Sequence, residues 1–313
     1  MSAKVLALCG GVGGAKLALG LAHEVAPEDL TVVVNTGDDF THLGLRICPD
    51  IDTVTYTLSG LANKELGWGR EDESWDFMDA LKALGGEDWF NLGDRDLAIH
   101  VERTGRLSKG EKLSDITADF AKRLGIGPTI IPMTNDQVAT IVDTEKGELA
   151  FQHYFVRDRC EPVVKKVRFA GAGDAKPCQA FQAALQAPEL TAIIVCPSNP
   201  LLSVDPILAL PGLRKMLEGH RVPVIAVSPI VGGKAIKGPT AKMMAELGHD
   251  VSAAGIVAHY GNLLDGFVVD EQDAEIAASL PVATHVTNTV MRTLEDRTSL
   301  ARAVLDFARM LKR

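Results

Sequence analysis

The sequence predicts an α/β protein built on a doubly wound, mainly parallel, Rossmann-like sheet with an inserted helical and antiparallel β subdomain. Apolar runs alternate with helical periods over most of the chain, as is typical of parallel sheets with right-handed crossovers. The first apolar run ends in a glycine-rich turn that leads into a helical pattern. The alternation is interrupted over approximately residues 63–175. We therefore expect a single α/β domain over 1–313, with a helical and β subdomain inserted at that point.

Short apolar runs bounded by turn residues are expected to form the core strands. They are Val5–Cys9, Leu30–Asn35, Ala192–Cys196, Pro223–Val227, Gly255–Ala258, Gly266–Val269 and Ala283–Val286. Segments with a helical period are expected to connect and cover these strands. They are Lys16–Glu24, Asp52–Leu61, Pro206–Leu210, Leu213–Glu218, Ala241–Leu247 and the closing amphipathic helix Ser299–Lys312.

The interruption has two parts with different composition. Residues 63–125 are richer in Trp, Gly and charge, which predicts short helices with irregular joints. Short β-type runs separated by turn residues follow, and they predict an antiparallel meander. These runs are Thr129–Met133, Val138–Thr144, Glu148–Tyr154 and Val164–Phe169.

Bulk composition excludes several classes of protein. The net charge of −9 argues against a nucleic-acid-binding surface. No segment reaches the roughly 20 apolar residues of a membrane span, and the N-terminus lacks an apolar stretch of signal length. The five cysteines show no metal-ligand spacing, which indicates buried free thiols. We expect a cytoplasmic protein that binds neither nucleic acid nor membrane.

The glycine-rich turn after the first strand is a candidate phosphate site. Its residues are Gly10, Gly11, Gly13, Gly14 and Lys16. A strand feeding such a turn aims backbone N–H groups and the positive end of a helix at one point, which suits a phosphate. The turn matches neither the dinucleotide fingerprint nor the Walker A loop. A tight turn needed only for steric reasons is the alternative.

Carboxylates gather after the second strand, at the edge where an open sheet keeps its ligands. Asn35 is followed by Asp38, Asp39 and His42, and then by the pair Asp50 and Asp52. Carboxylate oxygens suit Mg²⁺, so Asp38 and Asp39, together or singly, are predicted metal ligands. Turn chemistry and helix capping could account for some of these aspartates. His42 is equally well explained as a hydrogen-bonding partner.

Three more polar clusters follow predicted strands. Arg95 lies between two aspartates, and arginine suits planar or anionic ligands, although a surface ion pair would explain the same pattern. Ser198 and Asn199 stand between two prolines and offer hydroxyl and amide groups to a base or ribose. Gly232 and Gly233 precede a helix and form a second candidate phosphate turn, with a solvated loop as the alternative.

In its order of motifs the sequence resembles the 2-phospho-L-lactate transferases, which build the deazaflavin coenzyme F420. The resemblance covers about residues 4 to 290. Its motifs are Gly10–Lys16, Asn35–Asp39, Cys48–Thr53, Leu92–Leu97, Pro132–Asp136, Pro197–Pro200 and Ser228–Gly233.

The resemblance implies an enzyme that uses Mg²⁺ and a guanosine diphosphate conjugate of a three-carbon acid. The phospho-acid, which is 2-phospholactate, phosphoenolpyruvate or 3-phosphoglycerate, passes to the ribityl hydroxyl of the deazaflavin Fo, and GMP is released. The resemblance places Asp50 and Arg95 at Fo as catalytic residues, and it suggests a homodimer.

Combined with the residue chemistry, the resemblance gives a specific hypothesis for the site. The diphosphate would lie on Gly10–Gly14, and the guanosine toward Ser198, Asn199, Gly232 and Gly233. Asp50 would hold and deprotonate the ribityl hydroxyl, although it could equally be a metal ligand. Lys16, Asn35 and His42 complete the predicted substrate-binding residues.

Two other functions share some of these sequence features. A regulatory protein that binds UDP-sugars, similar to the gluconeogenesis factors, would share the glycine turn. The motifs Pro49–Thr53 and Leu92–Leu97 favour the transferase. A dinucleotide-dependent dehydrogenase would need a third loop glycine and an acidic residue where the second strand ends in Asn35, so that class is excluded.

Overall fold

The computed structural model describes residues 3–63, 68–235 and 238–311. A parallel seven-stranded sheet forms its centre, with strand order β14-β13-β10-β9-β1-β2-β5. In that order the strands are β14 (Ala283–Val286), β13 (Gly266–Val269), β10 (Val224–Val227), β9 (Leu190–Val195), β1 (Lys4–Cys9), β2 (Leu30–Val34) and β5 (Thr129–Pro132). The doubly wound α/β class predicted from the sequence is confirmed.

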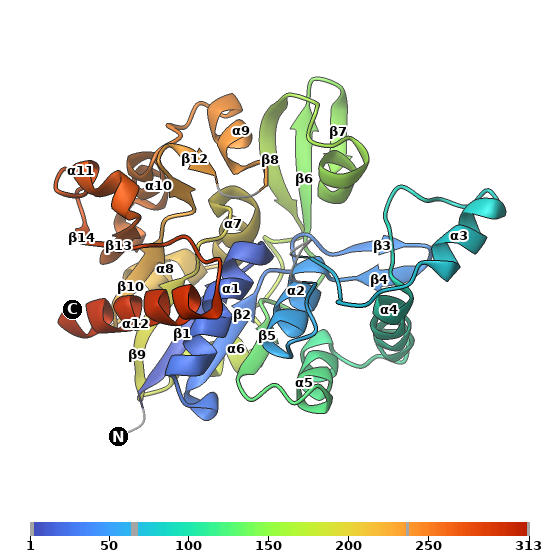
Figure 1. The fold of residues 1–313 in the computed structure, drawn as a ribbon, viewed down its shortest axis with the longest axis horizontal. Helices are drawn as coiled ribbons and strands as arrows, with labels where there is room; N and C mark the ends of the chain where they lie inside the picture. The colour runs from blue at the N-terminus through green and yellow to red at the C-terminus, as the bar shows by residue number, and fades with distance from the viewer. Residues whose placement is uncertain (1–2, 64–67, 236–237, 312–313) are drawn as a thin grey trace.

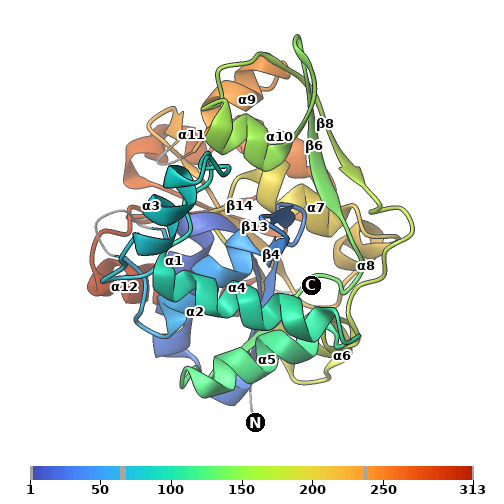
Figure 2. The same ribbon diagram turned by 90° about the vertical axis from the view of Figure 1, so that its right-hand side faces the viewer.

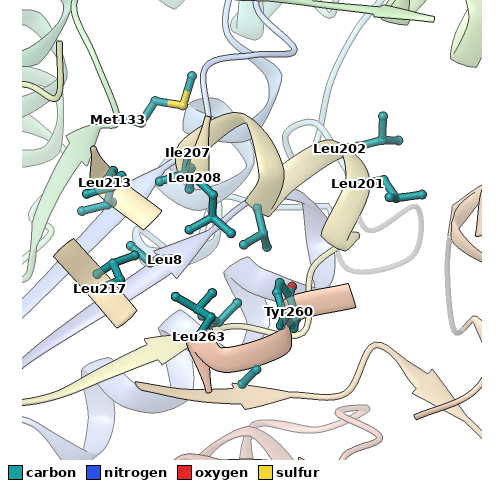
Figure 3. Packing of buried hydrophobic residues seen from close by; sticks show 14 of the residues in the cluster. Leu8, Met133, Leu201, Leu202, Ile207, Leu208, Leu213, Leu217, Tyr260 and Leu263 are labelled. Atoms are coloured by element: carbon teal, nitrogen blue, oxygen red, sulfur yellow. The ribbon is translucent and has the colours of Figure 1, made fainter. Parts of the chain in front are cut away.

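Helices cover both faces of the sheet because neighbouring residues of each buried strand pack in opposite directions. One face packs against α1 (Gly11–Glu24), α2 (Pro49–Leu58), α5 (Leu113–Arg123) and α12 (Leu294–Met310). The other packs against α6 (Gln179–Gln186), α7 (Asp205–Leu208), α8 (Leu213–Glu218), α9 (Thr240–Glu246) and α10 (Ala253–Tyr260). Figure 3 shows this second core, where Leu8 of β1 lies near Leu217 and Leu263.

The first and last helices pack side by side (Figure 1). A Cβ atom added to Gly20 of α1 would overlap the carbonyl oxygen of Arg297 in α12, so only glycine permits this approach. Arg302 of α12 forms two hydrogen bonds with Glu24 of α1, at 3.1 and 2.8 Å. The side chain of Thr293 caps α12, with Asp296 completing a capping box.

The remaining elements project from the carboxyl edge of the sheet (Figures 1 and 2). One group contains the hairpin β3 (Phe40–His42) and β4 (Leu45–Ile47), with α3 (Asp76–Ala83) and α4 (Asp94–Leu107). A second is the antiparallel sheet β7-β6-β8, formed by β6 (Ala139–Thr144), β7 (Gly147–Ala150) and β8 (Val164–Ala170). A small hairpin, β11 (Ile230–Val231) and β12 (Lys234–Ala235), precedes α9, and α11 (Ala274–Ala277) precedes β14.

Some predicted elements were wrong. Gly255–Ala258 is part of α10, whose N-terminus is capped by Ser252 accepting from the Gly255 N–H, because a short apolar run fits a buried helix as well as a strand. The Thr129–Met133 run does not join the meander, since β5 pairs in parallel with β2 in the core sheet. The predicted strand Glu148–Tyr154 ends at Ala150 and gives way to a π-helix over His153–Arg157.

Other predicted boundaries moved. Helix α1 begins at Gly11, inside the glycine turn, and α12 begins at Leu294. The predicted end of the last helix, Lys312, lies outside the described residues. Within the described part of the chain, no helix combines the length and the apolar character needed to cross a membrane.

Candidate active site

The candidate site lies at the switch point of the sheet, between β1 and β9. The chain winds from β1 toward β2 and later returns on the other side of β1 through β9, so the turns after these two strands face each other. A Cβ atom on Gly13 would overlap the carbonyl oxygen of Pro197, and one on Gly14 would lie 2.6 Å from Ser198 Oγ. These glycines are therefore required for the approach of the two turns.

A cavity of about 810 Å³ opens above this point. Gly10, Gly11, Val12 and Gly13, at the N-terminal end of the 14-residue helix α1, line its floor. The Ser198 hydroxyl donates to the Gly10 carbonyl oxygen at 2.8 Å and ties the two turns together. The volume of the cavity is that of a pocket for a small-molecule ligand.

Asp50 is fixed beside this floor at the start of α2. Its carboxylate accepts hydrogen bonds from the Gly11 N–H (2.8 Å) and from Asn35 Nδ2 (2.9 Å). Asn35 is itself held, because its Nδ2 also donates to the Leu202 carbonyl oxygen and its Oδ1 accepts from the Gly37 N–H. Burial raises the pKa of Asp50, while the two hydrogen bonds oppose this effect. Asn35 therefore positions Asp50.

The two aspartates after β2 point in different directions. Asp38 lines the cavity and accepts from Thr140 Oγ1 at 3.2 Å, and burial together with the Asp50 charge raises its pKa well above the usual value. Asp39 does not line the cavity, because its side chain turns to Arg46 Nη2 at 3.3 Å. Burial raises the pKa of Asp39 to about 7, against the opposing effect of Arg46.

Polar side chains line the side of the cavity near β9 and β14. Lys16, whose Nζ donates to the Met291 carbonyl oxygen at 3.0 Å, lies here with Arg292. Asn199 Oδ1 accepts from the Leu201 N–H at 3.0 Å. The Asn199 Nδ2 group is buried without a hydrogen-bond partner among the described residues, although the residue lines the cavity. A buried unpaired amide costs free energy, so this group is suited to a ligand acceptor.

Part of the cavity lining is aromatic. It is formed by Trp68, Trp89, Phe90, Phe151 and Phe155, which come from the segments before α3 and α4 and after β7. These five aromatic residues are not among the site residues predicted from the sequence. The only signal was the enrichment of Trp over residues 63–125.

Some predicted site residues lie outside the cavity lining. The Arg95 side chain is 54% exposed and lies 4.0 Å from the carboxylate of Asp72. Its neighbour Asp96 lines the cavity instead. Gly232 and Gly233 form the exposed turn between β11 and β12, where Gly232 donates its N–H to Asp273. Arg95, Gly232 and Gly233 do not line the cavity, so no contact in this structure supports the roles predicted for them.

His42 is a packing residue in this structure. It is buried, and its ring packs edge-on against Trp89, with ring centroids 5.0 Å apart. Burial lowers the pKa of His42, with Glu87 opposing this effect. His153, whose ring also packs against Trp89, has a pKa lowered by the same cause.

The lowered pKa of His42 predicts a pH-dependent stability. Below pH about 6.5 the unfolded chain takes up a proton on this histidine more readily than the folded protein does. The free energy of unfolding therefore decreases as the pH is lowered. His42→Gln should make that fall shallower between pH 7.5 and 5.5 in urea titrations. Equal pH dependence in the variant and the wild type would contradict this assignment.

Fold and site together define a doubly wound α/β protein with a phosphate-type glycine turn opening into an aromatic-walled cavity. The family model described as "2-phospho-L-lactate transferase CofD" matches residues 5–303. The chain belongs to this family of transferases, and it is an enzyme of that class.

Curated relatives carry two names. The chain is 40% identical over 314 residues to a phosphoenolpyruvate transferase of Streptomyces coelicolor, covering 97% of this chain and 98% of the relative. It is 38% identical over 307 residues to a 2-phospho-L-lactate transferase of Methanocaldococcus jannaschii, covering 97% of each. These relatives favour the transferase and give no support to the regulatory alternative.

A solved structure shares the fold. A member of the UPF0052 family from Bacillus halodurans superposes with a TM-score of 0.64 at 16% identity, covering 97% of this chain and 99% of the other. At this identity the likeness concerns the fold alone.

Proposed function

We propose that the enzyme transfers a phospho-three-carbon-acid group from a guanosine diphosphate conjugate to the terminal ribityl hydroxyl of the deazaflavin Fo. The observation that supports this most is the single cavity that joins the α1 N-terminus and Asp50 to an aromatic wall. A donor with a diphosphate and an acceptor with an aromatic ring system can lie in it end to end. The hydroxyl oxygen attacks the phosphorus that carries the acid, and GMP leaves with the bridging oxygen.

The glycine turn over residues 10–14, which we call the cradle, suits the donor. The first turn of α1 offers backbone N–H groups and the positive end of the helix dipole to a diphosphate. Lys16 and Arg292 are cations that line the same region. Ser198 and Asn199 lie on the β9 side, where the guanosine would extend.

Asp50 is the residue proposed to take the proton of the attacking hydroxyl. Its two hydrogen bonds from Gly11 and Asn35 fix the carboxylate next to the cradle. Positioning and charge stabilisation account for most of the rate of such a displacement. The raised pKa makes the Asp50 carboxylate a stronger base than an exposed aspartate.

A Mg²⁺ ion fits part of the predicted ligand set. Asp38 and Asp50 are buried carboxylates on the cavity, and the charge of Asp50 raises the pKa of Asp38, so a cation would relieve their repulsion. Asp39 does not fit, since it is turned away and paired with Arg46. Asp38 would hold the ion, which would supply charge neutralisation for the diphosphate.

Release of GMP tests the proposal directly. The protein is incubated with Fo and Mg²⁺ and, in separate reactions, with the lactyl, enolpyruvyl and glyceryl conjugates of guanosine diphosphate. We expect GMP and the phosphorylated deazaflavin in equal amounts with at least one donor, and a much lower rate when EDTA removes the Mg²⁺. No product with any donor would count against the transferase.

The unpaired amide of Asn199 predicts a loss of donor affinity on substitution. Asn199→Ser keeps a side-chain oxygen that can accept from the Leu201 N–H but removes the Nδ2 donor. We expect the dissociation constant for GDP to rise about tenfold, because a hydrogen bond in a buried site is lost. Calorimetric titration with GDP measures it, and an unchanged melting temperature shows that the turn is intact. Unchanged GDP affinity would contradict the role of Asn199.

We also propose that the enzyme is a homodimer that acts in the cytoplasm. The support for both statements is the resemblance to the transferase family. Sedimentation velocity of the purified protein tests the first, and fractionation of the source cells tests the second.

A further inference from the structure

Buried polar and charged side chains that the proposed reaction does not use lie at and behind the cavity wall. Asp52 and Tyr56 come from α2, and Asp96, His100 and Arg103 come from α4. We call these five residues the α2–α4 network. The α4 members are spaced by four and three residues, which places them on one helix face, and side-chain hydrogen bonds join this face to α2.

Contacts run continuously through the network. Arg103 donates to Asp52 through Nη1 at 3.1 Å and through Nη2. His100 Nδ1 lies 3.7 Å from Asp52 Oδ2, and His100 Nε2 lies 3.2 Å from Asp96 Oδ2. Tyr56 donates its hydroxyl to Asp96. His100 and Arg103 are each 1% exposed, so the network is built into the wall and is not a surface cluster.

The Nε2 atom of His100 has Asp96 as its one close polar neighbour among the described residues. It approaches Asp96 but makes no aligned hydrogen bond, and among the described residues it is a buried atom without a hydrogen-bond partner. His100 lines the cavity together with Asp52, Tyr56 and Asp96. The hydrogen bonding of the network is therefore incomplete at a residue that lines the cavity.

The charges of the network select the kind of group that can bind. The carboxylates of Asp52 and Asp96 repel a phosphate or an acid. These two carboxylates and His100 are close enough together to hold a metal ion, but the guanidinium of Arg103 already occupies Asp52 and would repel the ion. A neutral group with hydroxyls, which can both donate and accept, fits best.

The position of the network along α2 indicates which part of a ligand it meets. Asp50, Asp52 and Tyr56 follow one another along this helix, and the rise of 1.5 Å per residue puts Tyr56 about 9 Å beyond Asp50. Asp50 marks the proposed point of transfer, and the aromatic residue Trp68 lies on the side of Asp96, because both residues line the cavity and also a smaller pocket beside it. The network thus lies between the reacting hydroxyl and the ring of the acceptor.

We propose that the α2–α4 network binds the internal hydroxyls of the acceptor's polyol chain, with His100 as a positioning residue. This inference rests on the proposed function, in which a ribityl chain joins the aromatic ring to the attacking hydroxyl. A chain held at its internal hydroxyls presents its terminal hydroxyl to Asp50 in one orientation.

Two acceptors and two variants test the proposal. His100→Asn removes the Nε2 position, whereas His100→Gln places an amide nitrogen close to it. The acceptors are Fo and a deazaflavin whose five-carbon chain carries only the terminal hydroxyl. For His100→Asn we expect the KM of Fo to rise about tenfold or more, with partial recovery in His100→Gln. The KM of the analogue should be the same in both variants and the wild type.

Controls separate this result from damage elsewhere. The dissociation constant for GDP should stay unchanged in both variants, and His259→Asn, a half-buried histidine of α10 paired with Asp205, should keep the wild-type KM for Fo. An equal penalty with both acceptors, or loss of GDP binding, would overturn the proposal. Absence of transfer by the wild type with every donor would instead overturn the proposed function.

Discussion

Asp50→Asn is expected to reduce kcat at least about 100-fold while GDP still binds, because the carboxylate that takes the proton is gone. The substitution also has a local cost. Gly11 N and Asn35 Nδ2 both donate to Asp50, so the amide nitrogen of an asparagine must face one of these donors. Steady-state kinetics and separate titrations with Fo and GDP distinguish lost chemistry from lost binding. Turnover near the wild-type rate would remove Asp50 from the mechanism.

Asp38→Asn provides the matched comparison for Asp50. Both carboxylates are buried on the cavity, but only Asp50 is fixed by the glycine turn. If Asp38 holds the metal, its variant should recover activity as the Mg²⁺ concentration is raised. Asp50→Asn should not recover under the same conditions. Recovery of both variants would indicate that Asp50 is a metal ligand and not the base.

Gly13→Ala is expected to weaken GDP binding at least about tenfold and to lower the melting temperature. A methyl group at this position overlaps the Pro197 carbonyl oxygen, which belongs to the backbone and cannot rotate away. The turns after β1 and β9 must then separate, and the N–H groups of the cradle lose their alignment. Calorimetry with GDP and thermal unfolding measure the two effects.

Two other glycines serve as controls for Gly13. Gly105, inside α4, has no atom within 4 Å of an added Cβ, so Gly105→Ala should be neutral or stabilise by up to about 1 kcal/mol. Gly20→Ala should destabilise through the contact with α12 while the folded protein keeps its affinity for GDP. If Gly13→Ala behaved like Gly20→Ala, the glycine turn would have a packing role only.

The core of the fold could be predicted because its strands are buried on both faces. Such strands are continuous apolar runs, as Leu30–Val34 and Val224–Val227 show, and they stand out against the helices around them. The same criterion failed at Ala253–Tyr260, since a buried helix is equally apolar. It also could not assign Thr129–Pro132 to the core sheet, because the partner of an edge strand is decided by tertiary packing.

The candidate site was predictable only where its residues are local in sequence. The glycine turn and Asp50 each belong to one short motif at a strand or helix end. The aromatic wall is assembled from separate segments, so no local pattern announces it. At the start of α4 the motif Leu92–Leu97 was predicted correctly to be near the site, but Arg95 was chosen where Asp96 lines the cavity. Successive helix positions point about 100° apart, and this rotation turns Asp96 to the cavity and Arg95 to solvent.

The packing of α1 against α12 has a consequence for the order in which the protein is completed during synthesis. Glu24 and Arg302, which join these helices, are 278 residues apart in the chain. A ribosome therefore releases the cradle-bearing helix long before it releases the helix that covers it. Until then α1 lacks the packing that α12 supplies, and apolar surface left exposed in this way makes a folding intermediate prone to aggregation. The helix that carries the glycine turn is thus translated first and is among the last elements to reach its final packing.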